Sequence, residues 1–71
     1  MEEQIVYHYA AWVNTQRGQV NHDGVIIMPM VRSIEDYLNA RSLIAKDFTD
    51  AGVPCDPQAL NVIAFNILGD I

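Results

Sequence analysis

The sequence predicts an α+β domain with the element order β-β-α-β, in which one helix packs on one face of a three-stranded, mainly antiparallel sheet. Two observations support this fold. The chain opens with two strand-like segments joined by a turn, and a well-delimited helical pattern then separates them from a third strand-like segment. Because 71 residues leave no room for a second core, we expect a single domain spanning residues 1–71.

The first two strands are expected to form a hairpin. Residues 4–14 are dominated by β-branched and aromatic side chains, which favour a strand. The second strand ends at residue 28, because Pro29 cannot donate a hydrogen bond to a neighbouring strand. Two turn signals lie between them, Arg17-Gly18 and Asp23-Gly24. The second has the stronger turn chemistry, but the first leaves the strands better matched in length and is preferred.

The helix has clear start and stop signals. Ser33 suits the N-cap, and Asp36, three residues later, approximates a capping box. Gly52 and Pro54 end the helix. The inward stripe is expected to consist of Ile34, Tyr37, Leu38, Arg41, Ile44, Ala45 and Phe48. The stem of Arg41 should pack while its charged head stays in solvent. A loop over residues 53–58 then leads to a third strand over residues 60–68.

The strands are apolar on both faces, whereas a strand with one exposed face should alternate apolar with polar residues. In the first strand, Ile5, Tyr7, Tyr9, Ala11 and Val13 oppose Val6, His8, Ala10 and Trp12; in the third, Ile63, Phe65 and Ile67 oppose Val62, Ala64 and Leu68. Since one helix covers one face, we expect the other face to pack against a second copy, sheet on sheet or edge to edge, in a homodimer or higher oligomer. The alternative is that loops and tyrosine side chains fold over it.

Composition and charge argue against several classes of function. The net charge is −5 and the four basic residues are scattered, so the clustered Lys and Arg of a nucleic-acid-binding surface are missing. We expect no signal peptide, because the first residues are acidic and no long apolar run follows them. No apolar stretch approaches the roughly 20 residues of a membrane helix. With Cys55 as its only cysteine, the chain fits the reducing cytoplasm, where we expect it to act.

Residues with catalytic or metal-binding potential occur singly, so we expect no enzyme, no metal site and no cofactor. His8 and the His22-Asp23 pair lack the ligand spacing of a zinc site. We interpret His22 as part of a solvated turn and His8 as a partly packed strand residue. Cys55 is followed by Asp56, and an acidic neighbour disfavours the reactive thiolate.

Two hypotheses for function remain. The first is a small non-catalytic binding protein that acts through protein–protein interaction, with a second copy or a host protein as partner. Its interaction surface would use residue types that anchor protein contacts, namely Tyr7, Tyr9, Trp12 and Met28. The second is an oligomeric sponge that sequesters an anionic small molecule such as a nucleotide messenger. At a subunit junction, the guanidinium groups of these arginines would neutralise the ligand: Arg17, Arg32 and Arg41.

The layout of the chain resembles short accessory proteins encoded by bacteriophages and mobile elements. The resemblance rests on an aromatic-rich hairpin and on the segments MPMVRSIEDY at 28–37, AKDF at 45–48 and VIAF at 62–65. It spans nearly the whole chain but contains no diagnostic motif. Such proteins often act stoichiometrically, and the resemblance therefore implies an inhibitor that blocks a host defence protein or a protein that sequesters a nucleotide messenger.

Overall fold

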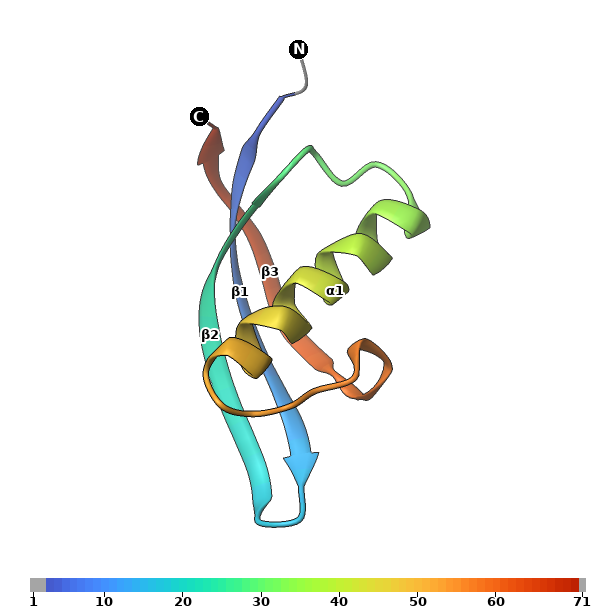
Figure 1. Ribbon diagram of the computed structural model, residues 1–71. Coiled ribbons are helices and arrows are strands. Elements are labelled where there is room, and N and C mark those ends of the chain that lie inside the picture. Colours follow the sequence, from blue (N-terminus) through green and yellow to red (C-terminus); the bar gives the residue numbers. More distant parts are fainter. Residues whose placement is uncertain (1–2, 71) are drawn as a thin grey trace.

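The computed structural model describes residues 3–70 and shows one three-stranded antiparallel sheet with one α-helix (Figure 1). The elements in chain order are β1 (Ile5–Thr15), β2 (Gly18–Met28), α1 (Ile34–Asp50), a short 3-10 helix η1 (Pro57–Ala59) and β3 (Asn61–Asp70). The strand order is β2-β1-β3, so the first strand is the central one. The predicted α+β fold with β-β-α-β order is confirmed.

The β1–β2 hairpin turns at Gln16 and Arg17, with Thr15 opposite Gly18. Gly18 has a φ of +114°, a conformation that side chains with a Cβ rarely adopt. This confirms the preferred turn at Arg17-Gly18. Asp23 and Gly24 are therefore not a turn but part of β2, where Gly24 lies opposite Tyr9. His22 belongs to the same strand, so its expected place in a solvated turn was wrong.

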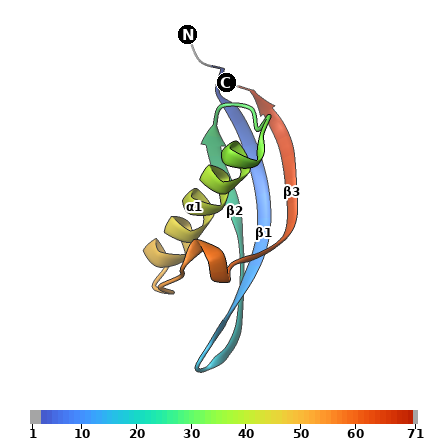
Figure 2. The same ribbon diagram turned by 90° about the vertical axis from the view of Figure 1, so that its right-hand side faces the viewer.

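The core lies between α1 and one face of the sheet (Figure 2). Every second residue of β1 is buried there, as the strand pattern predicted. Tyr9 of β1 and Phe48 of α1 are completely buried in this layer, at 0% exposure. The rest of the core consists of Ile5, Tyr7, Ala11, Val13, Ile26, Met28, Ala40, Ile44 and Leu60.

Both predicted helix ends are confirmed. The Ser33 hydroxyl accepts a hydrogen bond of 3.1 Å from the Asp36 amide, and the Asp36 carboxylate accepts one of 2.9 Å from the Arg32 amide. The first bond satisfies an amide group that the first turn of a helix leaves free, and the second ties the segment before the N-cap to that turn. At the other end, Gly52 takes a φ of +93° and the Val53 amide donates back to the Phe48 carbonyl, as expected for a glycine-terminated helix.

The inward stripe of α1 differs from the prediction at its N-terminal end. Ile34 and Leu38 are 80% and 55% exposed, whereas Ala40, which was not predicted, is fully buried. The reason is the oblique crossing in Figure 1: the last turns of α1 lie over β2, whereas its first turns diverge from the strands. Helical periodicity identifies which residues share a face but not where the sheet beneath that face ends.

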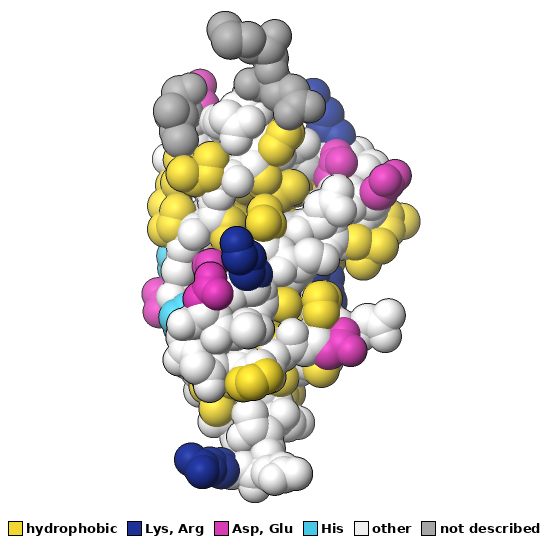
Figure 3. Space-filling model, in the orientation of Figure 1, with side chains coloured by type: hydrophobic (Ala, Val, Ile, Leu, Met, Phe, Trp, Pro, Cys, Tyr) yellow, Lys and Arg dark blue, Asp and Glu magenta, His cyan; other side chains and the backbone are white. Residues whose placement is uncertain are grey.

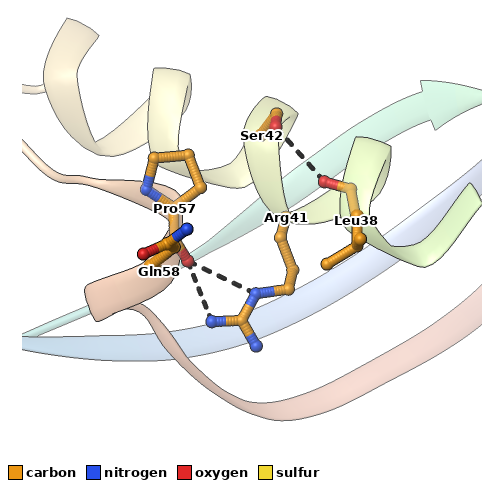
Figure 4. Close-up of a pocket in the computed structure, with 5 residues that line it drawn as sticks. All are labelled: Leu38, Arg41, Ser42, Pro57 and Gln58. Atoms are coloured by element: carbon orange, nitrogen blue, oxygen red, sulfur yellow. Dashed lines mark hydrogen bonds between the residues drawn. The ribbon is translucent and has the colours of Figure 1, made fainter. Parts of the chain in front are cut away.

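Arg41 is a second departure, because its guanidinium group does not lie in solvent. It donates hydrogen bonds to the carbonyl of Pro57, at 2.8 and 3.3 Å (Figure 4). It also donates to the carbonyl of Leu60, at 2.7 Å. Residues 53–58 were predicted as a simple loop, but η1 begins there with Asp56 as its N-cap. Arg41 thereby fixes the segment that leads into β3.

The pairing of β3 with β1 also corrects a predicted arrangement of side chains. The register shifts twice, so that Ile63 and Leu68 have no direct partner on β1. Val62 pairs with Ala11 and Phe65 with Tyr9, so Val62 and Phe65 share the helix side of the sheet. The simple alternation assumed for residues 62–68 fails because each such β-bulge changes which residues share a face.

We predict that Gly24→Ala lowers the free energy of unfolding by about 1–3 kcal/mol, the usual cost of overpacking. A Cβ at Gly24 would lie 3.0 Å from the hydroxyl and 3.2 Å from the ring of Tyr9, which is completely buried. Gly69→Ala is the matched control, since nothing lies within 4 Å of its added Cβ. We expect the control to gain about 0.5 kcal/mol. Urea unfolding of both variants measures the difference, and equal stabilities would contradict the packing described for Tyr9.

Candidate interaction surface

The face of the sheet opposite α1 forms a continuous surface, which we call the open face. Its side chains follow from the strand register: Val6, His8, Ala10 and Trp12 of β1 lie between residues of β2 and β3. The cross-strand rows are Ile27–Val6–Gly69, Val25–His8–Asn66, Asp23–Ala10–Ala64 and Asn21–Trp12–Asn61. One end of the open face is therefore aliphatic, and the other combines an indole ring with carboxamide groups.

Among residues 3–70, no helix or loop lies over the open face (Figure 2). Val25 and Ile27 are 49% and 51% exposed, although both are large aliphatic residues. The alternative in which loops and tyrosine rings cover this face is therefore wrong for the described chain. Tyr7 and Tyr9 both point to the other side, into the core. The prediction that α1 leaves the second face of the sheet uncovered is confirmed. This exposure identifies neither a binding partner nor an oligomer.

The open face is shallow and weakly charged. A hollow of about 190 Å³ lies against Ala10, Asn21, Asp23 and Ile63, among others. Beside it, His8 Nε2 and Asp23 Oδ2 are 3.4 Å apart, with the Asp23 side chain 75% exposed. An ion pair this exposed contributes little to stability. The surface thus suits the contact of two apolar layers better than the enclosure of a small molecule.

Charged groups break up the surface on the helix side. Figure 3 shows apolar side chains there in separate groups, with acidic and basic side chains between them. Near β2, a hollow of about 270 Å³ is lined partly by Lys46, Asp47 and Asp50. A hollow of about 550 Å³ lies between the end of β2 and α1 and is lined partly by Pro29, Asp36 and Asn39.

Three of the four predicted interaction residues lie in the core rather than at the surface. Tyr7, Tyr9 and Met28 are 3%, 0% and 7% exposed. Only Trp12 lies on the open face, where it is partly buried. The sequence reasoning missed Val25 and Ile27. A signal for them existed, because the uninterrupted apolar run at the end of β2 must place some of its residues on each side of the sheet.

The two buried tyrosines use their hydroxyl groups to connect the sheet to other elements. The Tyr7 hydroxyl accepts a 2.8 Å hydrogen bond from the Val31 amide, and its ring stacks on Phe65 with centroids 4.5 Å apart. The Tyr9 hydroxyl donates to the Asp47 carboxylate of α1 at 2.9 Å. Burial, followed by this bond and the charge of Asp47, raises the pKa of Tyr9 well above its ordinary value of 10.0.

The three arginines of the sponge hypothesis do not converge within one chain. Arg17 lies at the hairpin turn, whereas Arg32 precedes α1 and lies 3.3 Å from Glu3 at the other end of β1. A strand of this length spans about 33 Å, at roughly 3.3 Å per residue. The guanidinium group of Arg41 already donates to two backbone carbonyls. A shared anion site would therefore need arginines from different copies.

The remaining reactive side chains are placed unfavourably for chemistry. Burial, together with the charge of Asp56, raises the pKa of the Cys55 thiol, an effect that Arg41 only partly opposes. A raised pKa keeps the thiol in its less reactive protonated form. The His22 ring packs edge-on against Phe48, with centroids 5.2 Å apart. In the described part of the chain, no group of three or more His, Cys, Asp or Glu side chains is placed to hold a metal ion.

Comparisons with protein-family profiles, with characterised proteins and with solved structures found no match for this chain. The resemblance to phage-encoded accessory proteins thus gains no support from a relative. No helix within residues 3–70 combines the length and the apolar character needed to cross a membrane. Any statement about function must therefore depend on the chemistry of the surfaces described above.

We predict that Tyr9→Phe lowers the free energy of unfolding by about 1–2 kcal/mol at neutral pH, because the bond to Asp47 is lost. The pH dependence should also change. The pKa of Tyr9 is higher in the folded than in the unfolded chain, so its contribution is complete below the unfolded value of 10.0 and declines as the pH rises above it. Denaturant unfolding of both proteins between about pH 8 and pH 11 should show a steeper loss above pH 10 in the wild type. Parallel profiles of stability against pH for the two proteins would contradict the raised pKa of Tyr9 in the folded chain.

Proposed function

We propose that this chain is a small non-catalytic binding protein that acts in the cytoplasm, and that its open face docks on another protein. The observation that carries the proposal is the exposure of Val25 and Ile27 on a sheet face that no described element covers. Contiguous apolar surface of this kind is uncommon on soluble monomers and marks contact sites. A stoichiometric inhibitor of a host protein is the activity most consistent with such a surface.

The energetics of the open face favour a protein partner. Completely burying an aliphatic side chain stabilises by about 1.5–3 kcal/mol, so covering half-exposed residues such as Val25 and Ile27 gives roughly 1 kcal/mol each. Trp12 adds a large indole ring next to Asn21 and Asn61, whose carboxamides can hydrogen-bond at the rim of a contact. Aliphatic residues surrounded by neutral polar groups are the composition expected of a protein–protein contact.

The sponge hypothesis has weaker support from the geometry. It requires Arg17 and Arg32, from opposite ends of the hairpin, to approach one another in an assembly. It also requires Arg41 to exchange its bonds to Pro57 and Leu60 for bonds to a ligand. This exchange by Arg41 costs stability, because the carbonyls of Pro57 and Leu60 would lose a charged hydrogen-bond donor.

Affinity capture from the cells that express the protein tests the proposed surface. We predict that Trp12→Ser weakens binding to a captured partner by at least about 30-fold, since a tryptophan that anchors a contact contributes about 2 kcal/mol or more. Val25→Ser should also weaken binding, by a smaller factor. Quantitative mass spectrometry identifies the partner, and the Kd is then measured with purified proteins.

Leu38→Ser is the control variant, because Leu38 is about as accessible as Val25, at 55% against 49%, but lies on α1 on the other side of the sheet. Its partner recovery should equal that of the wild type. Circular dichroism must show the same fold for all variants. Equal binding by the three variants, or loss of binding only in Leu38→Ser, would reject the open face as the docking surface.

A further inference from the structure

The outer edge of β3 is the second unusual surface of the molecule. In the order β2-β1-β3, this strand pairs with β1 only, and within residues 3–70 the main-chain groups along its other edge have no strand partner. The strand runs for 10 residues, and its first nine, 61–69, include no charged side chain and no proline. Natural edge strands usually carry such residues because a free, apolar edge is a template for pairing with another strand.

Apolar side chains are exposed on β3 along its length. Ile67 pairs with the buried Tyr7 and therefore lies on the helix side, yet it is 55% exposed. The two bulge residues, Ile63 and Leu68, are 68% and 62% exposed. α1 reaches β3 through Tyr37, whose ring packs edge-on against Phe65 with centroids 6.0 Å apart, but it leaves Ile67 exposed on the same side.

The first turns of α1, which diverge from the strands in Figure 1, also expose apolar side chains. Ile34 and Leu38 point their aliphatic side chains into solvent, at 80% and 55% exposure. The neighbouring hollow of about 410 Å³ lies between Leu38, Arg41 and Pro57 (Figure 4). Apolar side chains of both β3 and the start of α1 are thus exposed.

The opposite edge of the sheet differs in character. The first half of β2, from Gly18 to Gly24, is polar and includes Asp23. Its apolar second half is flanked by Lys46 and Asp50 of α1. Charged groups of this kind discourage strand addition, so the two edges are not equivalent.

We propose that β3 pairs antiparallel with β3 of a second copy, joining two three-stranded sheets into one continuous six-stranded sheet. A second copy fits because residues 61–69 are uncharged in a chain with a net charge of −5, so the like charges of two copies stay apart at the contact. A two-fold axis perpendicular to the sheet places both helices on the same side. The exposed Ile63, Ile67 and Leu68 of each copy then lie at or beside the contact. This contact goes beyond the proposed function, which uses the open face.

Sedimentation equilibrium of purified protein tests this dimer with two matched variants. Ile67→Lys and Ile27→Lys change isoleucines of similar exposure, 55% and 51%, on opposite edge strands and opposite faces. We expect a wild-type mass of twice 8.0 kDa. Ile67→Lys should raise the dimer Kd at least 10-fold, because it places a charge inside the contact, whereas Ile27→Lys should leave the Kd unchanged.

A wild-type protein that stays monomeric up to about 1 mM would overturn the proposal. Loss of the dimer in Ile27→Lys would also overturn it, because that result would place the contact on the open face instead. Isotope-filtered NMR of a mixture of labelled and unlabelled wild type provides a test that needs no variant. We expect contacts between backbone protons of β3 in different copies. If a dimer lacked these contacts, the proposal would be overturned, and this test holds even if Ile67→Lys fails to fold. Partner capture through Trp12 is a separate measurement, so either proposal can fail alone.

Discussion

The structure depends on one geometrical constraint: a single helix must cover a sheet whose central strand is apolar on both faces. β1 pairs with strands on both sides and sends Ile5, Tyr7, Tyr9, Ala11 and Val13 into the core, while α1 packs against that side only. The helix also crosses obliquely, so that it covers β2 better than β3. Both unusual surfaces, the open face and the β3 edge, follow from this incomplete coverage.

The core is small, and polar groups hold its layers in register. Tyr7 and Tyr9 combine an aromatic ring inside the core with a hydroxyl at its boundary. One accepts a hydrogen bond from the segment before the helix, and the other donates to Asp47 near the helix end, so the same strand orients both ends of α1. Arg41 performs a similar task for the segment entering β3. Residue types that often mediate binding are used here to assemble the fold.

The two exposed surfaces differ in the kind of recognition they offer. The open face presents side chains only, so shape and apolar area decide what fits. The β3 edge presents main-chain donors and acceptors, which pair with another extended strand whatever its sequence, while Ile63, Ile67 and Leu68 set the preference for an apolar partner. The open face and the β3 edge involve different parts of the sheet. A second copy bound at the edge therefore leaves the central part of the open face, around His8 and Ala10, accessible.

The sequence by itself determined the order of the elements, both ends of the helix, the hairpin turn and the two apolar faces of β1. These features depend on local chemistry: proline and glycine geometry, the Ser33 cap and the alternation of side chains along a strand. Only the tertiary structure decided that Tyr7, Tyr9 and Met28 are buried, that Val25 and Ile27 are exposed, and that Ile34 and Leu38 at the start of α1 are exposed. Those outcomes depend on where α1 crosses the sheet and on two bulges in β3, and both arise from contacts between residues distant in the chain.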